Sequence, residues 1–146
     1  MSDSGELNLS VTRQFTASAE RVFDAFLDPA KAGKFMFATA TGQMVRVQID
    51  PRVGGSYAFV DRRDGEDVEH VGEYLEIQRP RRLVFTLRVE KYSNDTSTIT
   101  IDITPRGSGC ELRLTQVVTK QYAEHLQRIE AGWAMILDHA ATVIGE

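Results

Sequence analysis

The chain has 146 residues, of which 42% are hydrophobic and 26% are charged, the balance of an ordinary globular domain. Its formal net charge is −4, and Lys and Arg are scattered among Asp and Glu, so the basic tract that nucleic-acid binding needs is missing. The single cysteine, Cys110, excludes an internal disulfide. No run approaches the roughly 18 apolar residues of a membrane helix, and the polar N-terminus has no apolar signal segment. We therefore expect a cytoplasmic protein without membrane contact.

The N-terminal part is predicted to contain one strand followed by two helices. Apolar and polar residues alternate from about residue 7 to residue 16, which indicates a strand. Ser18 fits a helix N-cap, and the apolar residues between 22 and 27 recur at helical spacing. Asp28 and Pro29 end that helix and begin a short second one.

The middle of the chain, from about residue 44 to residue 118, is predicted to consist of strands joined by short turns. Asp64-Gly65 is a hairpin signal, and Gly107-Ser108-Gly109 marks a second turn. The predicted strands begin at Met44, Tyr57, Val68, Leu83, Thr98 and Leu112.

The last segment has the period of a helix. Its apolar residues step mostly by three and four from Tyr122 to Ile144. We expect one continuous helix of about six turns, roughly 35 Å long at about 1.5 Å per residue.

Segregated helices and strands predict an α+β fold, in which a curved antiparallel sheet of about six or seven strands grips the long C-terminal helix. Gly54, Gly55 and Gly72 are predicted to be bends or bulges in the sheet. A curved sheet does not close fully onto a straight helix, so the space between them is the candidate cavity. We expect a single domain over residues 1–146, with an ordered core at about 7–144.

Four short segments resemble a known superfamily. They are residues 18–29, Asp50-Pro51-Arg52-Val53-Gly54-Gly55, residues 72–77 followed by Pro80, and Gly132-Trp133. Their order and spacing, over about residues 7–144, resemble the START-like (SRPBCC, helix-grip) superfamily. The branch is that of the C-terminal domain of activators of the heat-shock-protein-ninety ATPase and of calicheamicin-resistance-like proteins. This resemblance implies a helix-grip fold with the C-terminal helix against a cavity.

The sequence carries no motif for catalysis or metal binding. His70, His125 and His139 have no second ligand at metal-binding spacing. Cys110 is interpreted as a small packed or edge thiol. His70 and Glu73 lie three apart on a predicted strand, so their side chains should point to opposite faces. We predict no catalytic residue, no metal and no cofactor.

The candidate ligand-binding residues are large apolar side chains of the strands and helices, and the alternative interpretation is ordinary core packing. They are Phe35, Phe37, Tyr57, Phe59, Tyr74, Phe85, Trp133 and Ile136. For Phe35, Met36 and Phe37, after the second helix, a mobile lid is a further hypothesis, and packing onto the core is its alternative.

The favoured function is binding of a small apolar or amphipathic molecule in the cavity. One alternative is a cyclase- or hydrolase-like enzyme that uses the same cavity, with Glu73, His70, Asp102 and Tyr57 as the ionisable groups to check. A second is a chaperone-regulating or stress-linked interaction domain, which needs a large exposed apolar patch. A homodimer through an edge strand or the exposed sheet face is also a hypothesis.

Overall fold

The computed structural model describes residues 6–37, 42–89 and 96–145. A strand and two helices come first: β1 (Glu6–Phe15), α1 (Ala19–Leu27) and α2 (Pro29–Phe35). Six strands follow: β2 (Gln43–Ile49), β3 (Ser56–Arg63), β4 (Glu66–Gln78), β5 (Arg82–Leu87), β6 (Ser97–Arg106) and β7 (Gly109–Thr119). The chain ends with a 3-10 helix, η1 (Lys120–His125), and α3 (Leu126–Ile144). This order confirms the predicted α+β class.

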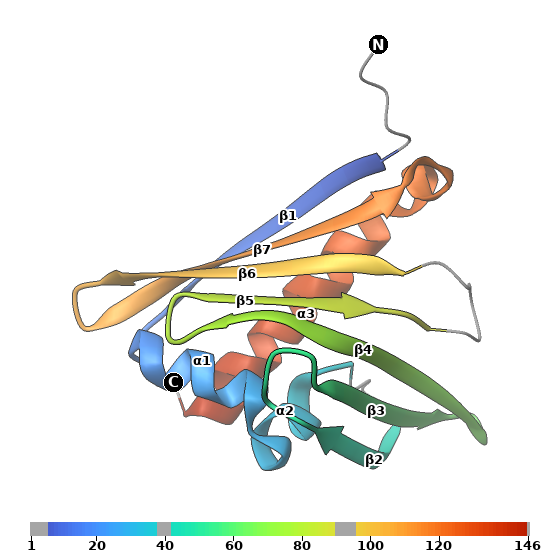
Figure 1. Cartoon of the computed structure of the whole chain (residues 1–146), viewed down its shortest axis with the longest axis horizontal. Helices are drawn as coiled ribbons and strands as arrows, with labels where there is room; N and C mark the ends of the chain where they lie inside the picture. The colour runs from blue at the N-terminus through green and yellow to red at the C-terminus, as the bar shows by residue number, and fades with distance from the viewer. Residues whose placement is uncertain (1–5, 38–41, 90–95, 146) are drawn as a thin grey trace.

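Within the described residues, seven strands form one sheet in the order β1-β7-β6-β5-β4-β3-β2. Each neighbouring pair is antiparallel. The sheet curves around α3, α2 lies beside β2, and α1 contacts β6, β7 and α3 (Figure 1). β1 pairs with β7 rather than with its neighbours in sequence, so the chain crosses the sheet through α1 and α2. The helix-grip prediction is confirmed.

The ends of the first two helices follow from their capping residues. The Ser18 hydroxyl accepts a hydrogen bond from the backbone N–H of Arg21, and the Asp28 carboxylate accepts one from the N–H of Ala30. Both side chains satisfy N–H groups that have no partner inside the helix. The predicted caps are therefore confirmed.

The predicted C-terminal helix is wrong in its first turns. Tyr122 lies in η1, and α3 begins only at Leu126, so α3 has 19 residues and is about 28 Å long at about 1.5 Å per residue. Neither Thr119 before η1 nor His125 before α3 caps its helix with a side-chain hydrogen bond. The tighter 3-10 turn is a common way to begin a helix that lacks such a cap.

The core lies between the concave face of the sheet and α3. Alternate strand residues such as Ile99, Ile101 and Leu114 are fully buried, as the period of two requires. The C-terminal half of α3 packs closely, because Leu137 and Ala140 are also fully buried. Its N-terminal half borders the open space described below.

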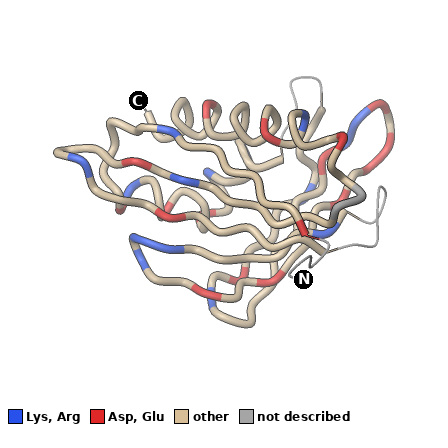
Figure 2. Tube along the Cα trace, turned by 90° about the horizontal axis from the view of Figure 1, so that it is seen from above, with Lys and Arg blue, Asp and Glu red and all other residues tan. Residues whose placement is uncertain are grey.

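Charges of both signs are mixed along the strands and α3 (Figure 2). The arginines around Pro80 belong to this pattern: Arg79 pairs with Asp24 at 2.7 Å and Arg82 with Asp102 at 2.9 Å. Exposed pairs of this kind contribute at most about 1 kcal/mol each to stability. None of the described helices is long and apolar enough to cross a membrane.

Candidate functional site

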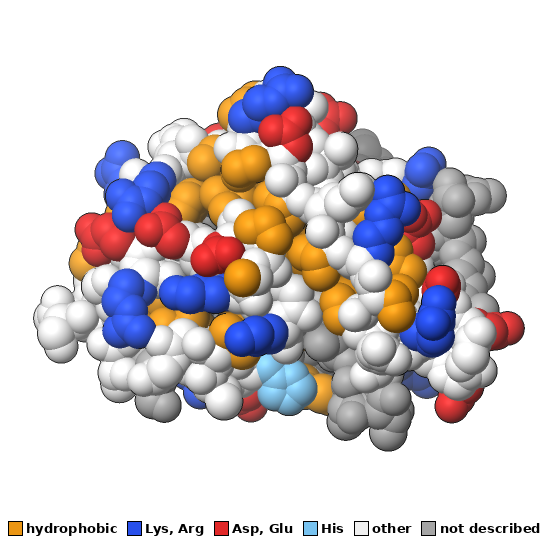
Figure 3. Space-filling model, turned by 90° about the horizontal axis from the view of Figure 1, so that it is seen from below, with side chains coloured by type: hydrophobic (Ala, Val, Ile, Leu, Met, Phe, Trp, Pro, Cys, Tyr) orange, Lys and Arg blue, Asp and Glu red, His pale blue; other side chains and the backbone are white. Residues whose placement is uncertain are grey.

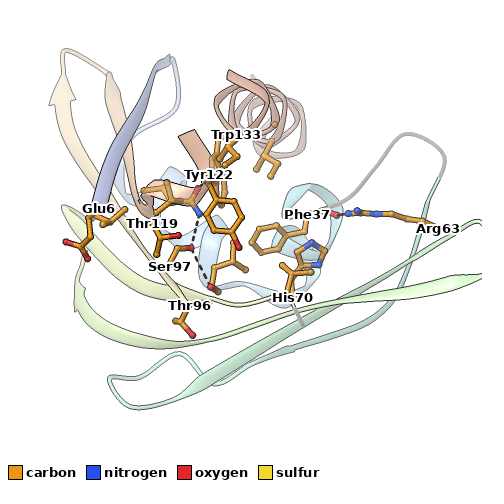
Figure 4. A pocket seen from close by; sticks show the side chains of 17 residues that line it. Glu6, Phe37, Arg63, His70, Thr96, Ser97, Thr119, Tyr122 and Trp133 are labelled. Atoms are coloured by element: carbon orange, nitrogen blue, oxygen red, sulfur yellow. Dashed lines mark hydrogen bonds between the residues drawn. The ribbon is translucent and has the colours of Figure 1, made fainter. Parts of the chain in front are cut away.

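A cavity of about 470 Å³ lies between the N-terminal half of α3 and the concave face of the sheet. Its wall is mainly apolar and includes Leu87, Ile129 and Ile136. In Figure 4, Tyr122 and Trp133 lie on one side of the cavity, and Phe37 and His70 lie on another. The exposed residues Glu6 and Thr96 also line it, so the cavity meets solvent there.

Three polar side chains form a hydrogen-bonded chain in this wall. The Trp133 indole Nε1–H donates to Gln116 Oε1 at 2.7 Å. Gln116 Nε2 donates to Ser97 Oγ at 2.8 Å, and that hydroxyl donates to the Leu87 carbonyl oxygen at 3.5 Å. Gln116 faces inward because it shares the β7 register with the buried residues Leu114 and Val118.

A second polar group, around His70, lies among aromatic rings. The His70 ring stacks on Phe37, with ring centroids 4.4 Å apart and planes 10° from parallel. Its Nδ1 lies 3.3 Å from the Phe59 carbonyl oxygen. Burial, reinforced by the positive charge of Arg63, lowers the pKa of His70 to about 4. The imidazole is therefore neutral at physiological pH.

Arg63 is held at the edge of the cavity by two partners. Its Nε donates to the buried Asp61 carboxylate at 2.7 Å, and its Nη2 donates to the Phe37 carbonyl oxygen at 3.2 Å. Its guanidinium points toward Phe37 in Figure 4. Phe37 itself has a φ of 59°, a conformation that non-glycine residues seldom adopt. Arg63 and His70 together fix this residue against the cavity.

The family model described as Activator of Hsp90 ATPase homolog 1-like protein matches residues 16–145. The chain belongs to this family. The match confirms the resemblance found in the sequence, since the family shares the helix-grip fold.

Solved structures agree with this family assignment. Protein CV1439 from Chromobacterium violaceum is 26% identical, with a TM-score of 0.84 over 95% of this chain and 97% of that one. The AHSA1-like protein from Aeromonas hydrophila is 20% identical, with a TM-score of 0.79 over 94% and 92% of the two chains. CalU16 from Micromonospora echinospora is 22% identical, with a TM-score of 0.71 over 94% and 76%. The last two similarities show the fold alone. Comparison with curated proteins gives no match.

In this member of the family, three of the eight candidate residues line the cavity: Phe37, Trp133 and Ile136. Four others form an aromatic cluster beside it, with neighbouring ring centroids 5.6 to 6.4 Å apart. These four are Tyr57, Phe59, Tyr74 and Phe85. The void among them holds about 10 Å³, so their rings are close-packed. Phe35 is fully buried against Phe26, away from both spaces.

The segment after α2 is packed onto the core. Phe35, Met36 and Phe37 are 0%, 3% and 7% exposed. Phe37 makes ring contacts with Phe59 and Trp133 as well as with His70. This burial favours the packing interpretation of these residues over the lid.

The four ionisable candidates do not converge. Glu73 is exposed and lies three residues from His70 on β4, so its side chain points to the opposite face of the sheet. Asp102 pairs with Arg82, and the Tyr57 hydroxyl donates to the Thr86 carbonyl oxygen at 2.6 Å. Burial raises the pKa of Tyr57 well above its usual value. Of the four, His70 alone lines the cavity. Among the described residues, no cluster of three or more His, Cys, Asp or Glu could hold a metal ion.

Gln116 and Ser97 are site residues that the sequence analysis missed. The signal for Gln116 was present, because it is the one polar residue at the inward positions 112, 114, 116 and 118 of β7. Ser97 carried no such signal, because it lies at the start of β6, before the clear alternation.

Proposed function

We propose that the protein binds a small, predominantly apolar molecule in the cavity between the sheet and α3. The observation that carries this proposal is the cavity itself, of about 470 Å³, with a mainly apolar wall. Small-molecule sites are typically concave, mostly apolar and about 300–1,000 Å³ in volume, with a few polar groups that orient the ligand. The AHSA1-like, START-like fold also suggests a ligand-binding domain in general.

Two further observations favour binding over the other hypotheses. Trp133, Gln116 and Ser97 of the cavity wall bond to one another, and the ionisable candidates are spread over both faces of the sheet. The exposed large apolar residues of the described chain lie on four separate segments: Val45, Val53, Leu75 and Met135. On the side that carries α2 and β2, apolar side chains form a broken band interrupted by charged ones (Figure 3). An interaction domain needs a large continuous apolar patch, and this surface supports that hypothesis less than the cavity supports ligand binding.

The experiment is a titration with N-phenyl-1-naphthylamine, an uncharged apolar probe whose fluorescence rises when it leaves water. We expect saturable binding of one probe per chain. Ile136→Trp should weaken it at least about tenfold, because the larger ring would fill the cavity that Ile136 lines.

The matched control is Met135→Trp. Met135 is the neighbouring residue on α3, but it is 51% exposed and does not line the cavity. This variant should bind the probe as the wild type does. If both variants bind like the wild type, or if the folded wild type does not bind at all, the proposal is wrong.

A further inference from the structure

We propose that the ligand of this cavity is uncharged in its buried part and carries a hydrogen-bond acceptor that binds the side-chain amide of Gln116. This inference rests on the proposed function and deepens it, because it specifies the chemical class of the ligand. It also makes Gln116 the residue that orients the ligand.

The orientation of the Gln116 amide is fixed by its partner on α3. The indole nitrogen of Trp133 is a donor only, and it lies 2.7 Å from one end of the amide. That end must therefore be the carbonyl oxygen, since an amide NH₂ group cannot accept the bond. The NH₂ group consequently lies at the other end, next to Ser97.

One hydrogen of this NH₂ group is left over. A primary amide has two N–H donors, and Ser97 Oγ takes one of them at 2.8 Å. In the part of the chain that the structure describes, Gln116 Nε2 makes no second hydrogen bond. The side chain is only 6% exposed and lines the cavity. Buried donors are nearly always paired, so an acceptor on the ligand is the partner that this geometry lacks.

The charged side chains that the structure describes around the cavity disfavour an ionised group in the buried part of the ligand. Arg63 already forms an ion pair with Asp61 at 2.7 Å, and its Nη2 donates to the Phe37 carbonyl oxygen. His70 is buried and uncharged. Glu6 is exposed where the cavity meets solvent. A buried carboxylate would therefore lack a compensating charge among the described side chains, at a high cost in free energy.

The test compares three compounds with one naphthalene body. 2-Acetylnaphthalene carries a carbonyl acceptor, 2-isopropenylnaphthalene replaces that oxygen with a CH₂ group, and 2-naphthoate carries a charge. Their Kd values are measured by calorimetry for the wild type, for Gln116→Leu and for Val118→Ala. Val118 lines the cavity two residues along β7 and has no polar side-chain atom.

We expect the preference for the ketone over the alkene to fall about tenfold in Gln116→Leu, the loss of one buried hydrogen bond. Val118→Ala should keep the wild-type preference while it weakens both ligands. 2-Naphthoate should bind the wild type at least about tenfold more weakly than the ketone.

A preference that Gln116→Leu leaves unchanged would overturn the inference, as would tighter binding of 2-naphthoate than of the ketone. Both results would leave the proposed function standing, whereas failure of all three compounds and of N-phenyl-1-naphthylamine to bind would contradict that function. Should Gln116→Leu not fold, the infrared carbonyl stretch of ¹³C-labelled 2-acetylnaphthalene bound to the wild type decides. A frequency lower than in hexane supports the hydrogen bond, and an unshifted frequency overturns it.

Discussion

His70 is surrounded by groups that disfavour a positive charge. Its ring stacks on Phe37, it is 6% exposed, and the guanidinium of Arg63 is near enough to repel a proton. Hydrogen bonds to the carbonyl groups of Phe59 and Val68 and the negative charge of Asp61 raise the pKa of His70 and offset this only in part. The folded protein therefore keeps His70 neutral to about pH 4, whereas an unfolded chain protonates it near pH 6.5.

This difference predicts a loss of stability in acid. Between pH 6.5 and about pH 4 the unfolded chain binds a proton at His70 that the folded chain does not, so the free energy of unfolding falls as the pH falls. The full loss from this residue is about 3 kcal/mol, because one pKa unit corresponds to about 1.4 kcal/mol. Urea unfolding of wild type and His70→Gln at pH 7, 5.5 and 4.5 measures it.

The comparison between the two proteins removes the contribution of the carboxylates, which both share. We expect the free energy of unfolding of His70→Gln to fall less steeply over this range than that of the wild type. Parallel pH dependences in the two proteins would show that His70 does not titrate as the structure requires.

At the residue scale, the sequence predicted the apolar part of the cavity better than its polar part. Trp133 and Ile136 follow from the helical stripe, since that stripe must face the sheet. Gln116 bonds to Trp133 across 17 residues, and no local pattern reports such a pairing. The neighbouring aromatic residues were indistinguishable by sequence: Tyr57 and Phe85 alternate inward just as cavity-lining residues do, but they pack against each other.

At the element scale, two glycines differ in the space around them: Gly72 is crowded by neighbouring atoms and Gly132 is not. Gly72 lies opposite Tyr57 in the register of β3 and β4. A Cβ atom there would come 1.9 Å from the Thr86 carbonyl oxygen and 2.6 Å from the Tyr57 ring. Gly132 is on α3, and a Cβ atom there would meet nothing within 4 Å. The first glycine permits a close approach of strands, whereas the second only weakens a helix.

The same substitution should therefore have opposite effects at these positions. Gly72→Ala should lower the free energy of unfolding by about 3 kcal/mol or more, because backbone and a ring must move to make room. Gly132→Ala should raise it by about 1 kcal/mol, the difference in helix propensity. Urea unfolding midpoints at one pH measure both, and a change of the same sign in the two variants would contradict this account.

The strands were predictable and the details at their ends were not. The alternation of apolar and polar residues predicts the start of every strand to within a few residues of its observed position, because one face of the sheet is buried. Gly72 was predicted only as a bend or bulge, and sequence could not show that it also leaves space for the Thr86 carbonyl oxygen and the Tyr57 ring, which are contacts between separate strands. The start of α3 was misplaced because the apolar stripe continues through η1, and 3-10 and α-helical turns share the spacing of three.

At the scale of the whole molecule, the cavity results from the mismatch between a curved sheet and a straight helix. The C-terminal half of α3 is buried at Leu137 and Ala140, while Ile129 and Ile136 border open space. Sequence predicts that such a space exists, because the sheet must curve. Its volume depends on strand twist and on the position of Phe37, which are set by contacts across the whole fold.

An unfilled apolar cavity lacks packing contacts on one side, so a molecule that fills it should stabilise the folded chain. At a free N-phenyl-1-naphthylamine concentration of about 100 times its Kd, the expected gain is about 2.7 kcal/mol. For a chain of this length, this gain raises Tm by roughly 5–10 °C. Differential scanning calorimetry of wild type and Ile136→Trp, with and without the probe, measures the change.

The wild type should show the rise in Tm and Ile136→Trp should not, because the new ring fills the cavity of that variant. An equal rise in both proteins would place the binding outside this cavity, and no rise in the wild type at a saturating concentration would mean that the probe does not favour the folded state.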